Sequence, residues 1–189
     1  MSDPKLQDGR VYRTEEFGDV DSNPTRLVKR LVAQGRLTPL RHGLYYAPRA
    51  SSFGPVPPRE DALLRAFFRG RPYLMTGPSF WNALGLGTTM VEARPLVYNT
   101  TRSGPVELAG RLFELRRTRF PRPATPEFFV VDLLENRSHA GLDAEVAHHA
   151  LAEALKAGHF SGEVLKDMAE RFGTKLTQAF VRSALDEAA

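Results

Sequence analysis

Residues 22–59 contain no aspartate or glutamate, although the chain of 189 residues has 22 acidic residues in total. This stretch carries seven cationic side chains, namely Arg26, Lys29, Arg30, Arg36, Arg41, Arg49 and Arg59. Such an uninterrupted positive field suits a polyanion, and we interpret the stretch as a surface for nucleic-acid phosphates. The alternative is an ordinary amphipathic helix with a solvated basic face, which is what most charge runs are.

The first part of this stretch predicts a helix that ends near Gly35. Ser22 or Asn23 provides the N-cap, and Pro24 stands in the first turn, where its missing N–H is not needed. Four apolar side chains repeat at the helical period and must pack inward: Leu27, Val28, Leu31 and Val32. At about 100° per residue, Arg26 and Lys29 lie on the opposite face, with Arg30 on its flank.

The second part predicts a β-hairpin. Residues 36–40 and 44–47 form its strands, and Gly43 supplies the positive φ that a short hairpin turn often needs. Upstream, residues 11–13 predict a strand that can pair with the hairpin, and Thr14 begins a brief helix. This order of parts is that of a winged helix-turn-helix, in which the helix enters the major groove and the hairpin tip reaches the adjacent backbone.

The predicted DNA contacts follow from this arrangement. We expect Thr25, Arg26, Lys29 and Arg30 at the groove, and Arg41 and His42 of the hairpin turn on the phosphate backbone. Arg26→Ala should then relax sequence preference. Arg41→Ala should weaken binding to all sequences together and flatten its dependence on salt. For His42, a solvated turn residue is the alternative.

The sequence predicts two domains. Residues 1–50 form the winged domain, and residues 51–59, rich in Pro, Gly and Ser, form a linker. Residues 60–189 form an α+β domain, in which a small mixed or antiparallel sheet is covered by C-terminal helices. We expect its strands over residues 95–100, 106–108, 111–117 and 127–131, and its final helices over residues 142–157, 161–173 and from Thr174 onward.

Several classes of function are disfavoured. The chain has no cysteine, no apolar run long enough to span a bilayer and no signal-peptide core, so we expect a cytoplasmic protein. His148 and His149 point about 100° apart on their helix, which is poor for one metal ion, and no cofactor motif is complete. A nuclease needs clustered acids and a lysine, yet residues 93–126 hold only Glu107 and Glu114 and no lysine. We therefore expect no enzymatic activity.

The same segment is instead rich in arginine. Five of these arginines are candidates for a second basic surface: Arg102, Arg111, Arg116, Arg117 and Arg119. They would form a second nucleic-acid surface or a face for an acidic partner. The alternative is that these arginines lie on solvated edge strands, where their charge prevents pairing with another chain.

The hairpin sequence RLTPLRHGLYYAP and the later segment YLMTGPSFWNALGL together resemble the AbiEi family of antitoxin-type transcriptional regulators. The matching positions include Gly35, the hairpin of residues 41–46 with Pro48, and Ser79 with residues 83–86. The resemblance, which covers roughly residues 9–135, implies a winged helix-turn-helix that represses its own operon. It also implies a C-terminal domain that counters a nucleotidyltransferase-like toxin in a type IV toxin-antitoxin pair.

The resulting hypothesis is a sequence-specific, non-enzymatic regulator that binds double-stranded operator DNA, with no cofactor and no membrane partner. One alternative is a protein-interaction module that neutralises a nucleotidyltransferase-like toxin without binding an operator. Another is an RNA-binding module that uses the arginine-rich strands, which would retain folded RNA more tightly than duplex DNA.

Overall fold

The computed structural model describes residues 4–52, 54–88 and 94–189. The chain divides into two compact units, one of residues 1–73 and 106–112 and one of residues 74–105 and 113–189. This division differs from the sequence prediction, because the helix that follows the proposed linker belongs to the first unit. Its apolar face packs against the strands before it, as described below.

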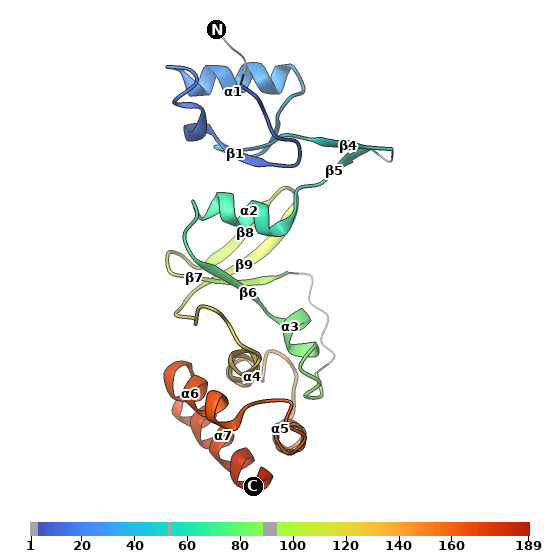
Figure 1. Ribbon diagram of the computed structural model, residues 1–189, viewed down its shortest axis with the longest axis vertical. Coiled ribbons are helices and arrows are strands. Elements are labelled where there is room, and N and C mark those ends of the chain that lie inside the picture. Colours follow the sequence, from blue (N-terminus) through green and yellow to red (C-terminus); the bar gives the residue numbers. More distant parts are fainter. Residues whose placement is uncertain (1–3, 53, 89–93) are drawn as a thin grey trace. The chain divides into compact units, whose positions relative to one another are not determined.

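The first unit begins with a small sheet and a helix. Its first elements are strand β1 (Val11–Arg13), the 3₁₀ helix η1 (Thr14–Phe17), helix α1 (Pro24–Ala33), strand β2 (Thr38–Arg41) and strand β3 (Leu44–Tyr46). The strands form an antiparallel sheet in the order β1-β3-β2. The predicted pairing of the early strand with the hairpin is therefore confirmed, and α1 lies across this sheet (Figure 1).

The two faces of this sheet have different partners. Tyr12 and Tyr45 stand opposite each other and share one cluster with the buried face of α1. Because side chains alternate along a strand, their neighbours point to the other face. There, helix α2 (Glu60–Phe67) packs against β1, and the Arg13 guanidinium donates to the carbonyl of Ala66 at 3.0 Å. The sheet thus lies between α1 and α2.

The predicted linker over residues 51–59 is partly a second hairpin. Strands β4 (Arg49–Ser51) and β5 (Gly54–Val56) pair antiparallel. The Tyr46 hydroxyl donates to the carbonyl of Val56 at 2.6 Å and ties this hairpin to β3. The linker prediction was wrong here because an isolated two-stranded ribbon tolerates Pro55, whose missing N–H is harmless at a sheet edge. Proline and glycine content alone could not reveal the pairing.

Within the residues that the structure describes, the second unit combines a sheet with five helices. Its strands belong to a sheet of order β6-β7-β9-β8, and β7 and β9 pair in parallel. The bounds are β6 (Tyr73–Thr76), α3 (Pro78–Asn82), β7 (Leu96–Asn99), β8 (Gly104–Leu108), β9 (Arg111–Arg117), α4 (Pro126–Glu135), α5 (Ala144–Lys156), α6 (Gly162–Phe172) and α7 (Lys175–Ala188). The division between the units passes through β6, β8 and β9.

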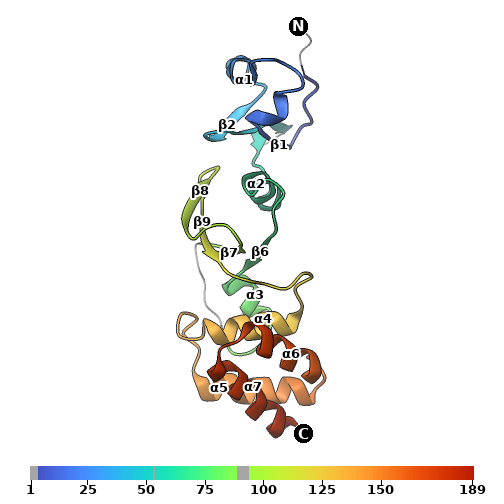
Figure 2. The ribbon, with the colours of Figure 1, turned by 90° about the vertical axis from the view of Figure 1, so that its left-hand side faces the viewer.

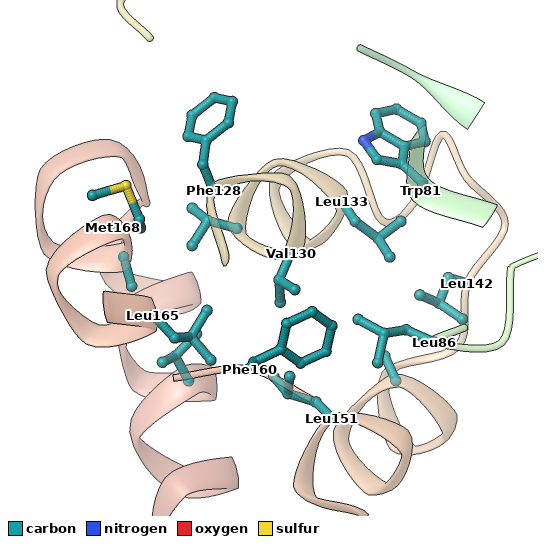
Figure 3. Packing of buried hydrophobic residues seen from close by; sticks show 14 of the residues in the cluster. Trp81, Leu86, Phe128, Val130, Leu133, Leu142, Leu151, Phe160, Leu165 and Met168 are labelled. Carbon is teal, nitrogen blue, oxygen red and sulfur yellow. The ribbon is translucent and has the colours of Figure 1, made fainter. Parts of the chain in front are cut away.

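The core of the second unit is built around α4. Helix α6 packs against both α4 and α7, and α7 packs against α5 (Figure 2). Figure 3 shows Val130 and Leu133 of α4 directed into a cluster with Leu151 of α5 and Leu165 of α6. All four side chains are fully buried. Ser161 and Thr174 cap α6 and α7, since their hydroxyl oxygens accept hydrogen bonds from the backbone N–H groups of Val164 and Thr177.

One predicted strand is a helix. Residues 127–131 were predicted as a strand from their aromatic and β-branched side chains, yet they lie in α4, which Thr125 caps and Pro126 begins. Because α4 is buried on most of its surface, its sequence is apolar almost all round and lacks the helical period. The α+β fold is confirmed. Among the described residues, no helix is long and apolar enough to cross a membrane.

Candidate nucleic-acid interface

Helix α1 has a fixed orientation in its unit. The Asn23 side chain caps it by accepting the N–H of Arg26 at 3.0 Å, as one of the two predicted caps requires. Leu27, Val28 and Leu31 are at most 2% exposed and face the sheet. Burial of each such side chain stabilises the unit by roughly 1.5–3 kcal/mol, so the helix cannot rotate about its axis without a large loss.

This orientation decides which polar side chains reach solvent. Thr25, Arg26 and Lys29 are exposed, as predicted, and Arg30 is half-buried on the flank. Lys29 forms no ion pair with any residue that the structure describes, and the first turn of α1 has no acidic residue. The exposed face of α1 therefore presents positive charge that no carboxylate of its own helix offsets.

The hairpin turn behaves differently from the prediction for Arg41. Gly43 has a φ of +75°, as predicted, and His42 is exposed at the turn. Arg41 pairs across the hairpin with the buried Leu44, and its guanidinium carbon lies 5.7 Å from the ring centroid of Phe67 in α2. Paired residues share a face of the sheet, so Arg41 points toward α2. The structure does not bring it to the exposed face of α1.

Arg36 has a structural position after α1. Its guanidinium donates to the carbonyl of Pro4 at 2.9 Å and holds the N-terminal segment against the end of the helix. Of the seven cations in the acid-free stretch, Arg36 is half-buried and bonded to the N-terminal segment, whereas Arg41 is exposed with its guanidinium near Phe67. Arg26 and Lys29 remain the exposed pair on one helical face.

The hairpin of β4 and β5 is an exposed element that the sequence prediction missed. The residues of β4 are exposed, and so are Pro55 and Val56 of β5. In Figure 1 this hairpin extends away from the other strands of the first unit. The Ser51 hydroxyl donates to the carbonyl of Gly54 at 2.7 Å and supports the turn. Arg49 at its base adds one exposed cation to this unit.

The five arginines of the predicted second basic surface do not form one surface. Arg111, in the first unit, makes an ion pair with Glu60 at 3.0 Å. Arg116 and Arg119 line the same pocket in the second unit. Arg117 is exposed and points to the other face of β9 from Arg116, because neighbouring side chains alternate. Arg102 lies in the turn that follows β7, where its backbone is held by Asn99.

The described histidine and acidic side chains do not have the arrangement that a metal ion needs. Among the described residues, no group of three or more His, Asp or Glu side chains could hold a metal ion. His148 and His149 instead lie near Glu187, at 3.2 and 3.9 Å.

No family model matches the chain, and no curated protein matches it. Among solved structures, the chain is similar to the crystal structure of the RV2827C protein from Mycobacterium tuberculosis, with a TM-score of 0.57 and 14% sequence identity. The match covers 95% of this chain and 72% of that chain. At this identity the likeness concerns the fold alone, and it extends over both units of the chain.

Proposed function

We propose that this chain is a sequence-specific DNA-binding regulator that reads the major groove with helix α1. The observation that carries the proposal is the exposed face of Thr25, Arg26 and Lys29 on a helix whose opposite face is locked into a core. A helix of 10 residues is about 15 Å long, and the major groove is about 12 Å wide, so α1 can enter it.

The roles of the side chains follow from their chemistry. Arg26 lies in the first turn, the part of a recognition helix that faces base edges, and an arginine can donate two hydrogen bonds to a guanine. Thr25, beside it, can contact a base edge or a phosphate. Lys29 is one turn further along and supplies a phosphate contact that responds to salt. Arg30, on the flank, adds to the positive field.

The exposed turns supply the contacts on either side of the helix in this proposal. His42 at the hairpin turn can donate to a phosphate, whereas Arg41 contributes less because its guanidinium lies over Phe67. The hairpin of β4 and β5, with Arg49, can follow the backbone beyond the groove. None of the described residues of this hairpin is buried, so its side chains are available for contacts with a nucleic acid.

The most direct test reverses the charge of α1. Fluorescence anisotropy of a labelled duplex would compare the full chain with the double variant Arg26→Glu/Lys29→Glu. The matched control is Arg117→Glu/Lys166→Glu, which makes the same change in net charge on exposed residues of the second unit. We expect the α1 variant to lose roughly 100-fold in affinity and the control to lose much less. Equal losses in the two variants would show attraction by net charge alone and would contradict the proposal.

The resemblance to the AbiEi family extends this proposal to an autorepressing antitoxin. In this reading, the first unit binds the operator and the second opposes a nucleotidyltransferase-like toxin. Co-expression with a candidate toxin from the adjacent gene tests the second part. Growth should be rescued by the full chain and also by the Arg26→Glu/Lys29→Glu variant, because toxin neutralisation does not need DNA binding. Absence of rescue by the wild-type chain would contradict the antitoxin part and leave the DNA-binding part standing.

A further inference from the structure

A buried carboxylate lies in the second unit and forms no ion pair within the described residues. Asp132 of α4 is 4% exposed. One of its oxygens accepts from the Thr76 hydroxyl and from the Trp81 indole N–H, the latter at 2.8 Å. The other accepts from the Tyr98 hydroxyl and from the Asn136 amide. These donors come from β6, α3, β7 and α4, so the carboxylate joins four elements.

Asn136 links this carboxylate to an arginine. Its amide nitrogen donates to Asp132, and its carbonyl oxygen accepts from the Arg116 guanidinium at 2.7 Å. The Arg116 guanidinium carbon also lies 5.8 Å from the centroid of the Tyr98 ring. This hydrogen bond uses one of the five N–H donors of Arg116. Arg116 is therefore held in one place by buried groups and keeps donors for a further partner.

Arg116 and Arg119 line a pocket of about 180 Å³. Phe128, Val131 and Phe172 form the apolar part of its lining. Arg119 is exposed and makes no hydrogen bond or ion pair with a residue that the structure describes. The pocket thus combines two guanidinium groups with three apolar side chains, of which only Phe172 is more than 3% exposed.

Two carboxylates also line this pocket, and both have other partners. Glu135 accepts the backbone N–H of Thr174 at 2.7 Å, at the start of α7. Asp132 accepts from four donors, and burial raises its pKa. Neither carboxylate forms an ion pair with Arg116 or Arg119 within the described part of the chain. The two guanidinium groups therefore keep unused hydrogen-bond donors, and Glu135 keeps acceptor capacity beside them.

We propose that this pocket binds the phosphate group of a nucleoside monophosphate, either free or at the 5′ end of an RNA strand. Guanidinium groups donate paired hydrogen bonds to phosphate oxygens, and Arg116 is already oriented by Asn136 for this purpose. Phe172, which is partly exposed at this pocket, can contact the sugar or base. This inference does not rest on the DNA-binding proposal, because every residue it uses belongs to the second unit.

Calorimetric titration of the full chain tests the inference. The probes are AMP, inorganic phosphate, adenosine and a 5′-phosphorylated RNA trinucleotide. Trp81, the single tryptophan of the chain, gives a second signal because its indole donates to Asp132. We expect saturable binding of AMP, with adenosine and inorganic phosphate each at least roughly tenfold weaker, since each lacks one half of the interaction. Tighter binding of the trinucleotide than of AMP assigns the site to an RNA end, and equal or weaker binding assigns it to a free nucleotide.

Three single variants locate the site. Arg116→Ala and Arg119→Ala should each weaken AMP binding by roughly tenfold or more. Arg117→Ala, which removes the same charge from the opposite face of the strand, should change it by less than about twofold. Because Arg119 is exposed and has no structural partner among the described residues, its removal should cost little folding stability. Absence of AMP binding, equal binding of adenosine, or an equal loss in Arg117→Ala would overturn the inference.

Discussion

The exposed face of α1 and the pocket around Arg116 use the same kind of side chain in opposite ways. Arg26 and Lys29 are solvated cations that a packed helix holds on one surface. Arg116 is a cation that a buried network of Asp132, Asn136 and Tyr98 holds by hydrogen bonds. The first arrangement suits a long polyanion, because such a ligand is bound by the sum of many weak contacts. The second suits a small anion that must be held by few contacts.

The difference also has energetic consequences. Removing Lys29 from α1 costs little folding stability, because this side chain is exposed and forms no ion pair within the described residues. Removing Asp132 should instead cost much folding stability, because the buried donors around it would all lose the same acceptor. Mutations should therefore separate the regions, with α1 variants changing affinity and network variants changing stability.

The largest expected effect is on the stability of the second unit. Asp132→Ala leaves the donors of Thr76, Trp81, Tyr98 and Asn136 without their acceptor, and we expect the free energy of unfolding to fall by about 3 kcal/mol. Urea denaturation followed by Trp81 fluorescence reports this unit. The control Asp167→Ala, which removes an exposed carboxylate paired with Arg171, should cost under about 1 kcal/mol. Equal effects of the two substitutions would mean that the network does not support the fold.

The next effect is the pH dependence of the free energy of unfolding that arises from Asp132. Burial raises the pKa of Asp132, so the folded chain keeps this proton at a pH where the unfolded chain has lost it. The stability from this group is therefore present at low pH and is lost as pH rises from about 4 through the folded-state pKa, by at most about 1.4 kcal/mol per pH unit. Unfolding of wild type and Asp132→Asn should be compared across pH. Their difference should fall with rising pH, and a constant difference would contradict a raised pKa.

A smaller effect concerns the affinity for DNA. Lys29→Ala should weaken binding to all duplexes by a similar factor and reduce the slope of log affinity against log salt by about 0.9, because one phosphate contact is lost. Lys166→Ala, an exposed cation of α6, should leave the slope unchanged. Anisotropy titrations over a range of salt concentrations measure both. An unchanged slope for Lys29→Ala would remove this residue from the interface.

The smallest expected effect is that of Arg41→Ala. The sequence suggested a general loss of affinity, but the guanidinium lies over Phe67 on the face of the sheet that packs against α2. We now expect less than about a twofold change in affinity at low salt, together with a small loss of stability of the first unit. A loss as large as that of Lys29→Ala would show that Arg41 leaves Phe67 to contact DNA.

Local patterns explain which parts were predictable. The α1 register, its Asn23 cap, Gly43 and the pairing of β1 follow from periodicity and turn chemistry over a few residues. Helix α4 was mistaken for a strand because a helix buried all round has no polar face to reveal its period. The hairpin of β4 and β5 was hidden by its proline and glycine content.

The pocket could not be predicted, because its parts meet only in the folded chain. Thr76, Trp81, Tyr98, Arg116 and Asn136 come from separate elements, and each alone reads as an ordinary strand or helix residue. Asp132 directly follows residues 127–131, which were predicted as a strand. The nearest sequence signal was the run of arginines in residues 93–126, which showed positive charge but not which of its members share a site.

The central claim is that α1 reads the bases of duplex DNA. Selection from a library of randomised duplexes, performed in parallel with the wild-type chain and with Arg26→Ala, tests it most directly. We predict that the wild-type chain enriches a defined motif and that Arg26→Ala loses preference at one or two positions of that motif, at a cost of roughly 1–3 kcal/mol per lost base contact. Failure of the wild-type chain to enrich any motif, or recovery of the same complete motif by Arg26→Ala, would contradict the account.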